Sequence, residues 1–165
     1  MPKFLTQAQL DQYHQDGFVA PVTVMSPEEA TEIRQALEAA EEKWPQALAP
    51  TNRNNAHLEF TCLDALAHRE SVLNAVEDII GPDILIHGTV IFAKEPGSTG
   101  FVSWHQDATY EGLVPHDGVT AWIALTPSTP VNGCMQMIPG SHKWGIQAHN
   151  DTFGEDNILT RGQVI

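Results

Sequence analysis

Residues 81–97 read GPDILIHGTVIFAKEPG, and the character of the chain changes within this stretch. Gly81 and Pro82 end a helical pattern, because glycine is favoured directly after a helix and proline cannot continue one. The apolar, β-branched run from Ile84 to Ala93 then predicts a strand, which the Pro-Gly pair at the end of the stretch closes. We therefore expect helices before about residue 82 and strands after it.

Three further runs downstream have the same strand-like composition, at residues 101–107, 119–125 and 134–138. Pro-Gly, Asp-Gly and Asn-Gly pairs lie around them, and such pairs mark tight turns. The pattern predicts an antiparallel, mainly β unit over about residues 83–165.

The upstream part opens with a helix start signal. Thr6 and Gln9 have the spacing of a capping box, in which each side chain bonds the backbone N–H of the other residue. A short helix over about residues 7–16 is expected, and Gly17 should end it. The β-branched stretch at residues 18–24 predicts a short strand.

Two more helices are predicted before the change at residue 82. Ser26 and Pro27 repeat the start signal, and an apolar stripe then continues to Trp44, where this helix should end. A third helix is expected over residues 72–80, with Ser71 as its first capping residue.

The composition defines the class of protein and excludes some partners. A chain of 165 residues with 42% hydrophobic and 18% charged residues is typical of one globular domain. The net charge of -13 and the eight Lys and Arg residues argue against nucleic acid or an anionic membrane as a partner. No apolar run is long enough to span a bilayer, so a soluble, cytoplasmic protein is expected.

The segment Trp104-His105-Gln106-Asp107 carries the chemistry. In an extended strand, residues two apart point to the same face, so His105 and Asp107 can bind one cation together. They supply two of the three ligands of a facial site with two His and one carboxylate, which is typical of non-haem iron. A His-x-Asp/Glu pattern is weak by itself, because roughly one match is expected by chance in such a chain.

The same spacing recurs elsewhere in the chain, and its context separates the matches. The pair at residues 14 and 16 falls in a predicted helix, where residues two apart face nearly opposite sides. The pairs at 68 and 70 and at 149 and 151 lie in polar connecting stretches, where solvated side chains are expected. The rival is the pair at 57 and 59, since residues 57–62 could be extended.

Four blocks, in this order along the chain, resemble the phytanoyl-CoA dioxygenase family of Fe(II)- and 2-oxoglutarate-dependent oxygenases. They are LTQAQLDQYHQDGFV at 5–19, GPDILIHGTVIFAKEPG at 81–97, WHQDATY at 104–110 and VTAWIALTPSTPVNGCMQMIPGSH at 119–142. The last eleven residues of the final block are far more specific than the metal pattern. The resemblance covers nearly the whole chain.

The resemblance implies a fold and an activity. The fold would be a double-stranded β-helix, a cupin-like jelly roll, in a single domain at 1–165 with a helical part at about 1–82 and a β-rich part at about 83–165. The activity would be hydroxylation of an unactivated carbon on a small-molecule substrate, with Fe(II) as cofactor and 2-oxoglutarate as co-substrate.

The resemblance also implies roles for individual residues. His105 and Asp107 would be the first two iron ligands, and an Asp at this position favours hydroxylation over halogenation. Lys94 would hold 2-oxoglutarate, and Trp122 would line the pocket of that co-substrate. Tyr110 would line the substrate cavity, because it lies close to the metal pair in the sequence.

The chain departs from the family pattern at its C-terminal end. The family takes a third iron ligand, a distal His, and an Arg that binds 2-oxoglutarate from strands after the PGSH turn. Here His149 is the only histidine and Arg161 the only arginine after His142, and neither falls in a segment that matches the family pattern. We therefore expect a jelly roll that is incomplete at its C-terminus, with a possible homo-oligomer covering the open side of the barrel. The alternative function is a non-catalytic jelly-roll binding module or an inactive fragment of such an oxygenase.

Overall fold

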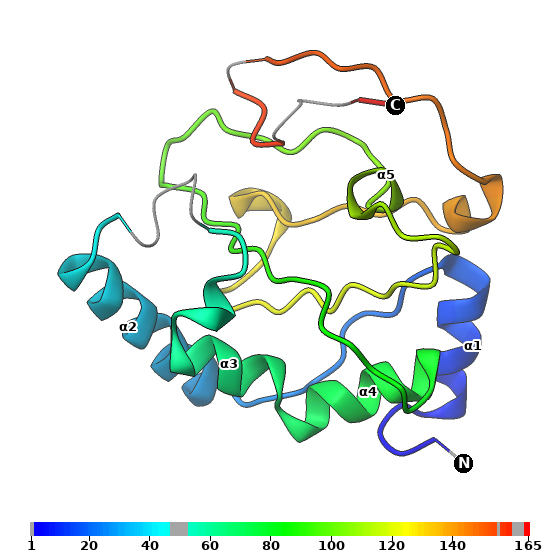
Figure 1. Cartoon of the computed structure of the whole chain (residues 1–165), viewed down its shortest axis with the longest axis horizontal. Helices are drawn as coiled ribbons and strands as arrows, with labels where there is room; N and C mark the ends of the chain where they lie inside the picture. Colours follow the sequence, from blue (N-terminus) through cyan, green and yellow to red (C-terminus); the bar gives the residue numbers. More distant parts are fainter. Residues whose placement is uncertain (1, 47–52, 155, 160–163) are drawn as a thin grey trace.

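The computed structural model describes residues 2–46, 53–154, 156–159 and 164–165 (Figure 1). Five α-helices occur within these ranges: α1 (Gln7–Asp16), α2 (Pro27–Lys43), α3 (Thr61–Ala67), α4 (Glu70–Ile80) and α5 (Ala108–Glu111). Three short 3-10 turns accompany them: η1 (Ala56–Leu58), η2 (Pro130–Asn132) and η3 (Ser141–Trp144).

The first two predicted helices are confirmed, together with their capping. In α1, the backbone N–H of Gln9 donates to Thr6 Oγ1 at 3.3 Å, and that of Thr6 donates to Gln9 Oε1 at 2.9 Å. Ser26 and Glu29 form the same pair of bonds at the start of α2. Both helices therefore begin at the residue where local side-chain chemistry satisfies the first backbone N–H groups.

The third predicted helix is present, but it begins two residues earlier than expected, at Glu70 with Arg69 as its capping residue. The Ser71 hydroxyl does not cap it and instead donates to the carbonyl of Val24 at 2.6 Å. The sequence does not predict α3, because residues 57–62, which include the start of this helix, are considered as extended chain. Arg69 also bonds Glu29 on α2 at 2.5 Å, so an interaction between helices fixes this boundary.

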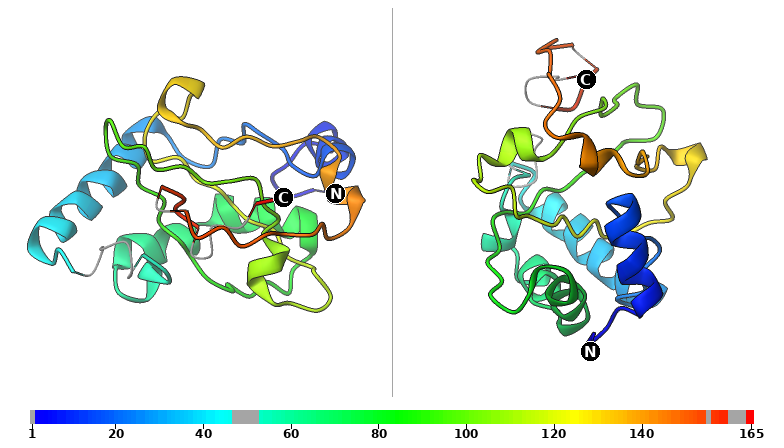
Figure 2. Two further views of the ribbon diagram at one scale, coloured as in Figure 1. Left: turned by 90° about the horizontal axis from the view of Figure 1, so that it is seen from above. Right: turned by 90° about the vertical axis from the view of Figure 1, so that its right-hand side faces the viewer.

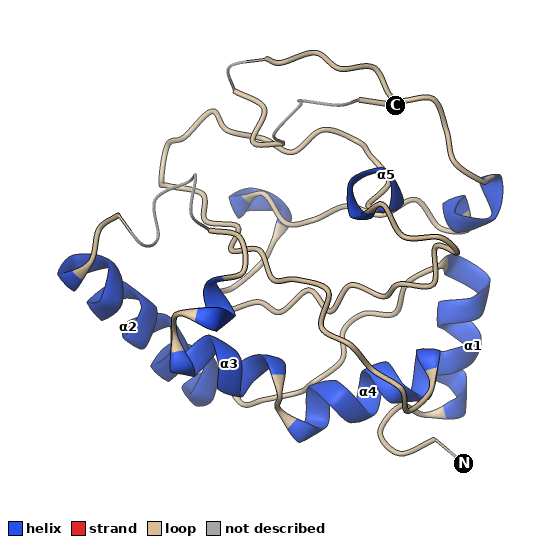
Figure 3. Cartoon of the chain, viewed as in Figure 1, coloured by secondary structure: helices blue, strands red, loops and turns tan. Residues whose placement is uncertain are grey.

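The mainly β jelly roll expected from the sequence and from the family resemblance is wrong for the described residues. Figure 3 shows helices and loops, and the runs at residues 84–93, 101–107, 119–125 and 134–138 form no sheet among the described residues. The β-type contacts within the described ranges are three isolated bridges, Asn54 with Val90, Phe101 with Asn157 and Asn150 with Val164. The strand predicted at residues 18–24 is absent too, and these residues have no regular secondary structure.

The physical reason lies in what a strand requires. Alternating apolar residues and turn pairs predict an extended backbone, but a sheet also needs a neighbouring strand for each N–H and C=O group. The periodicity carries no information about that neighbour. We expected a homo-oligomer because an incomplete barrel would have an open side to cover. Without the barrel that argument is lost, and the oligomer stays a prediction.

The helices carry the buried core. Leu37 and Ala40 of α2 pack with Ala56 of η1, with Phe60 just before α3 and with Leu63 of α3. Ile91 and Leu125 from the extended region add partly buried contacts. In Figure 1, α2, α3 and α4 follow one another along one side of the molecule, and the extended chain lies over them. Both that view and the right panel of Figure 2 place residues 150–154 on the far side from α4.

The PGSH turn, residues 139–142, packs together with Lys143 on the C-terminal end of α1. The backbone N–H of Gly140 donates to the carbonyl of Asp16 at 2.8 Å, and Lys143 Nζ donates to that of Gln15 at 2.9 Å. His142 Nε2 donates to the carbonyl of His14 at 3.3 Å. The last carbonyls of a helix have no hydrogen-bond donor within the helix. Here a segment more than 120 residues further along the chain provides the donors for them.

Candidate functional site

His105 and Asp107 lie side by side where the extended chain enters α5. His105 Nε2 is 3.1 Å from Asp107 Oδ1, with the imidazole 22% and the carboxylate 55% exposed. The predicted strand does not cause this arrangement, because Asp107 has helical backbone angles, φ -54° and ψ -37°, as the residue that caps α5. A tight turn at the start of α5 therefore brings together the two side chains that were predicted from the sequence.

Both side chains are held by further hydrogen bonds. His105 Nδ1 donates to the carbonyl of Ser103 at 2.8 Å, which aims Nε2 at Asp107. The hydroxyl of Thr120 donates to Asp107 Oδ2 at 3.0 Å, which leaves Oδ1 facing the imidazole. Tyr110 stands edge-on to the His105 ring, with the ring centroids 5.8 Å apart.

The pair is polarised electrostatically. The hydrogen bond with Asp107 raises the pKa of His105 above its ordinary value, against partial burial, and the Ser103 carbonyl adds to the rise. The hydrogen bond with His105 lowers the pKa of Asp107, against partial burial, and Thr120 helps to lower it. Both imidazole nitrogens face an oxygen acceptor, an arrangement that favours the protonated ring, with one proton shared between Nε2 and the carboxylate.

The donors of this pair fit a divalent cation of the iron type. Two ligands about 2.1 Å from one ion and at right angles lie about 3.0 Å apart, close to the separation of Nε2 and Oδ1. An ion that displaced the shared proton would meet an imidazole whose Nδ1–H is fixed by a backbone carbonyl, the usual support for a metal-binding His. Among the described residues no group of three or more His, Cys, Asp or Glu side chains is arranged to hold a metal. The described part of the chain thus brings together two donors.

Gln106, between the two donors, is bound by the segment after η3. Its backbone N–H donates to His149 Nε2 at 2.9 Å, and its side chain bonds the carbonyl of Gly145 at 2.9 Å and the N–H of Gln147 at 2.7 Å. His149 therefore lies beside the pair, but its Nε2 faces the backbone of Gln106. Arg161 lies outside the described residues.

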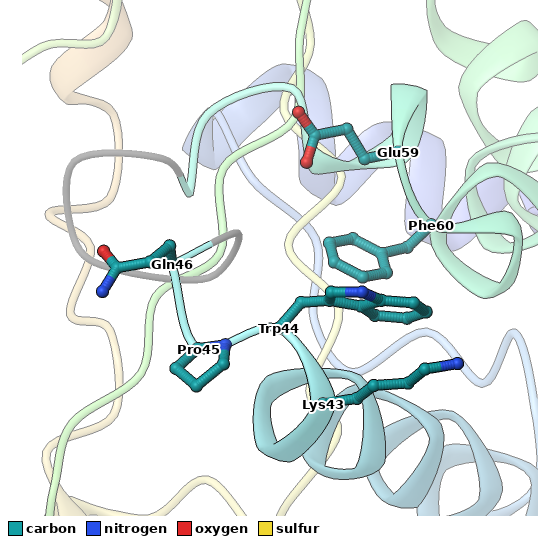
Figure 4. Close-up of a pocket in the computed structure, with 6 residues that line it drawn as sticks. All are labelled: Lys43, Trp44, Pro45, Gln46, Glu59 and Phe60. Carbon is teal, nitrogen blue, oxygen red and sulfur yellow. The ribbon is translucent and has the colours of Figure 1, made fainter.

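The rival pair is separated by the local fold. His57 lies in η1, and its Nδ1 is 2.8 Å from the hydroxyl of Thr89. Glu59 lines a hollow at the end of α2, together with Lys43, Trp44, Pro45, Gln46 and Phe60 (Figure 4). The 3-10 turn thus directs the two side chains to different surroundings.

That hollow lies away from the metal pair. Its volume is about 580 Å³, and Lys43 Nζ sits 4.3 Å from the centroid of the Trp44 ring. Figure 1 shows α5 well separated from the end of α2 where the hollow lies. The chemistry of the His-Asp pair and this hollow are therefore separate features.

The remaining predicted residues have the following surroundings. Lys94 Nζ donates to the carbonyl of Gly133 at 2.9 Å, within the last of the four family-like blocks, residues 119–142. The Trp122 side chain is 44% exposed. Sequence reasoning did not identify Thr120 and Gln147 as partners of the site, and it placed His149 in a solvated pair, whereas its Nε2 accepts from the N–H of Gln106. No local pattern marks these contacts, because they span 13 to 43 residues.

An oxygenase class follows when this site is compared with known proteins. The family model described as "Phytanoyl-CoA dioxygenase (PhyH)" matches residues 13–162. The chain belongs to the phytanoyl-CoA dioxygenase family, as its four sequence blocks predicted.

Curated relatives carry oxygenase names. The chain is 32% identical over 97 residues to a probable alpha-ketoglutarate-dependent hypophosphite dioxygenase of Stutzerimonas stutzeri, covering 59% of this chain and 34% of that protein. It is 27% identical over 164 residues to a methylphosphonate hydroxylase of Gimesia maris, 91% and 62% of the two chains. An ectoine dioxygenase of Nocardia farcinica is 30% identical over 152 residues, 82% and 50%.

The chain therefore spans less than two thirds of the length of each of these relatives. No solved structure matches it. Within the described ranges no helix combines the length and the apolar character needed to cross a membrane.

Proposed function

We propose that the chain provides the iron-binding part of an Fe(II)- and 2-oxoglutarate-dependent dioxygenase that hydroxylates an unactivated carbon of a small molecule. The observation that carries the proposal is the pairing of His105 Nε2 with Asp107 Oδ1 at 3.1 Å, in a chain of this family. Relatives named as alpha-ketoglutarate-dependent or as dioxygenases support the reaction class.

In this proposal the residues of the site have distinct tasks. His105 and Asp107 would hold the iron, His105 through Nε2 and Asp107 through Oδ1. Thr120 holds the second oxygen of Asp107, so that one carboxylate oxygen remains directed at the metal. When bound, iron with 2-oxoglutarate and dioxygen supplies the oxidising chemistry, which belongs to the cofactor.

Three further residues complete the proposed site. Lys94 binds a carboxylate of 2-oxoglutarate as a point charge, after its ammonium group leaves the carbonyl of Gly133. Trp122, partly exposed, lines the pocket of that co-substrate. Tyr110 borders the substrate cavity, in keeping with its edge contact to the His105 ring.

Anaerobic titration of the 165-residue chain with Fe(II) and 2-oxoglutarate tests the proposal. We expect weak but measurable binding, seen as the absorption band of the iron and keto-acid complex, because two protein donors leave much of the ion hydrated. Asp107→Ala should weaken Fe(II) binding at least about tenfold, since it removes one of the two donors.

Glu59→Ala is the matched control, because it removes the carboxylate of the rival pair. It should leave Fe(II) binding unchanged. If Glu59→Ala abolished binding and Asp107→Ala did not, the metal-binding pair would be wrongly chosen. If the wild-type chain bound no Fe(II), the alternative of a non-catalytic binding module or an inactive fragment would replace the proposal.

A further inference from the structure

We infer that Gln106 and His149 form a clasp that positions the two metal ligands on either side of Gln106. The inference rests on the proposed function, because a positioning role has meaning only if His105 and Asp107 bind a metal. The clasp consists of Gln106 together with Gly145, Gln147 and His149. These are positioning residues, and none of them is offered as a metal ligand.

Every polar group of Gln106 has a partner. Its N–H donates to His149 Nε2, its Oε1 accepts from the N–H of Gln147, and its Nε2 donates to the carbonyl of Gly145. Its carbonyl accepts from the hydroxyl of Thr109 at 2.8 Å and from the backbone N–H of the same residue at 3.1 Å. The residue between the ligands is thus fixed on all sides, although it contributes no metal-binding atom.

The hydrogen bonds define the tautomer of His149. A backbone N–H can only donate, so Nε2 must be the unprotonated nitrogen, and Nδ1 carries the hydrogen that it donates to the carbonyl of Gln147 at 2.8 Å. Gln147 therefore contacts both ends of the clasp, Gln106 through its N–H and His149 through its carbonyl. The bonds close a ring, and neither nitrogen of His149 is left over for an ion.

The geometry explains why this ring affects the ligands. The N–H that His149 accepts belongs to the peptide plane joining His105 to Gln106, and the carbonyl that Thr109 binds belongs to the plane joining Gln106 to Asp107. Fixing both planes fixes the direction in which each flanking side chain leaves the backbone. A site with two protein donors depends strongly on such order, because freely moving donors lose conformational entropy when they bind.

Three variants and two measurements test the clasp. His149→Leu removes both ring nitrogens at similar volume, His149→Gln restores an acceptor oxygen near the position of Nε2, and His87→Leu is a matched control at an exposed histidine outside the site. The first measurement is the exchange rate of the Gln106 amide by NMR in the metal-free protein. The second is the affinity for Co(II), used as a redox-stable probe, by calorimetry.

In His149→Leu we expect the Gln106 amide to exchange about five to ten times faster, the effect of losing one hydrogen bond. Co(II) binding should weaken about tenfold, the lower end of the effect of removing a partner that orients a ligand. His149→Gln should recover most of both values, which a purely volumetric role of the ring would not allow. His87→Leu should match the wild type in both.

The two measurements separate the possible failures. Faster exchange with unchanged Co(II) affinity would overturn the positioning role and leave the proposed metal site standing. Absence of Co(II) binding in the wild type would overturn the proposed function, and this inference with it. If His149→Leu failed to fold, Gln106→Leu, which removes only the two side-chain bonds, should weaken Co(II) binding in its place, and unchanged affinity there would overturn the clasp.

Discussion

The helical region, residues 2–46 and 53–80, and the extended region, residues 81–154, differ in where their apolar side chains lie. The nine hydrophobic residues buried in the described structure all belong to the helical region, from Leu5 to Val72. Most exposed large hydrophobic residues belong to the extended region, among them Val90, Phe92, Met135 and Met137. Apolar content alone therefore does not decide burial.

The difference shows which structures a sequence can complete locally. A helix satisfies its backbone groups within itself, and its apolar stripe needs only one neighbour to be covered. An extended segment needs a partner for its backbone and cover on at least one face. The helical region satisfies both requirements with nearby residues, whereas the extended region depends on distant contacts.

Truncation of a phenylalanine in each region gives the largest expected contrast. Phe60 is 9% exposed in the helical core, and Phe60→Ala should lower the free energy of unfolding by about 3–5 kcal/mol. Phe92 is 50% exposed, and Phe92→Ala should cost about 1 kcal/mol or less. Urea unfolding of both variants checks the comparison. Equal losses would mean that the extended region contributes a core of its own.

The same contrast explains how much of the fold could be predicted from the sequence. Capping pairs such as Ser26 and Glu29 lie three residues apart, so both start signals could be recognised in the sequence. The start of α4 depends instead on the contact of Arg69 with Glu29, 40 residues away, and was misplaced. The predicted strands failed for the same reason, because a strand partner is a distant residue.

The candidate site also combines contacts that local spacing predicts with contacts that come from distant parts of the chain. His105 and Asp107 are two residues apart, and their adjacency followed from local spacing, although a turn and not a strand brings them together. Thr120 and His149 reach them or Gln106 from 13 and 43 residues away, which only the folded chain shows. Their roles in metal binding stay predictions.

The next largest effect is expected where the two regions meet, at Gly17. Its φ is +86°, and an added Cβ would lie 2.4 Å from Nδ1 of His142 in the PGSH turn. Gly17→Ala should therefore cost more than about 2 kcal/mol, from the left-handed backbone and from the displaced ring. Gly112 also ends a helix, with φ +66° and open space around it, so Gly112→Ala should cost only about 1 kcal/mol.

Comparing the two glycine variants by thermal unfolding isolates the contact between the regions. If both lowered the melting temperature equally, the backbone would account for the whole effect and the packing of His142 on α1 would contribute nothing. A second variant, His142→Ala, should then be neutral as well. We expect instead that His142→Ala relieves part of the cost of Gly17→Ala when the two are combined.

A smaller effect is expected from the cap of α2. Ser26→Ala removes the hydroxyl that accepts from the N–H of Glu29, and the variant should lose about 1 kcal/mol of stability. Ser26→Asp keeps an acceptor at the same place and should stay close to the wild type. Chemical denaturation followed by far-UV circular dichroism measures both. A neutral Ser26→Ala would show that contacts with other elements, and not the local cap, set the start of α2.

The smallest effect concerns Asp78, through which α4 holds the N-terminal segment of the helical region. Its carboxylate accepts from the N–H groups of Lys3 at 2.6 Å and of Phe4 and Leu5 at 2.8 Å. Desolvation raises the pKa of Asp78, but these three donors and the charge of Lys3 outweigh it, so the pKa lies below its ordinary value.

Because the pKa is lower in the folded state, ionised Asp78 stabilises the fold above the pKa of the unfolded chain, near 4. That contribution should fade as the pH falls through the lower folded value. Asp78→Asn keeps one acceptor oxygen but cannot serve three N–H groups, so at pH 6 it should be less stable by about 0.5–1 kcal/mol, given the partial exposure of these bonds. At pH 3, below the unfolded value, the gap to the wild type should shrink, since the unfolded wild-type chain then takes up a proton on Asp78. Urea unfolding at both pH values decides this, and a gap that widened on acidification would mean that Asp78 is not the group that ties residues 3–5 to α4.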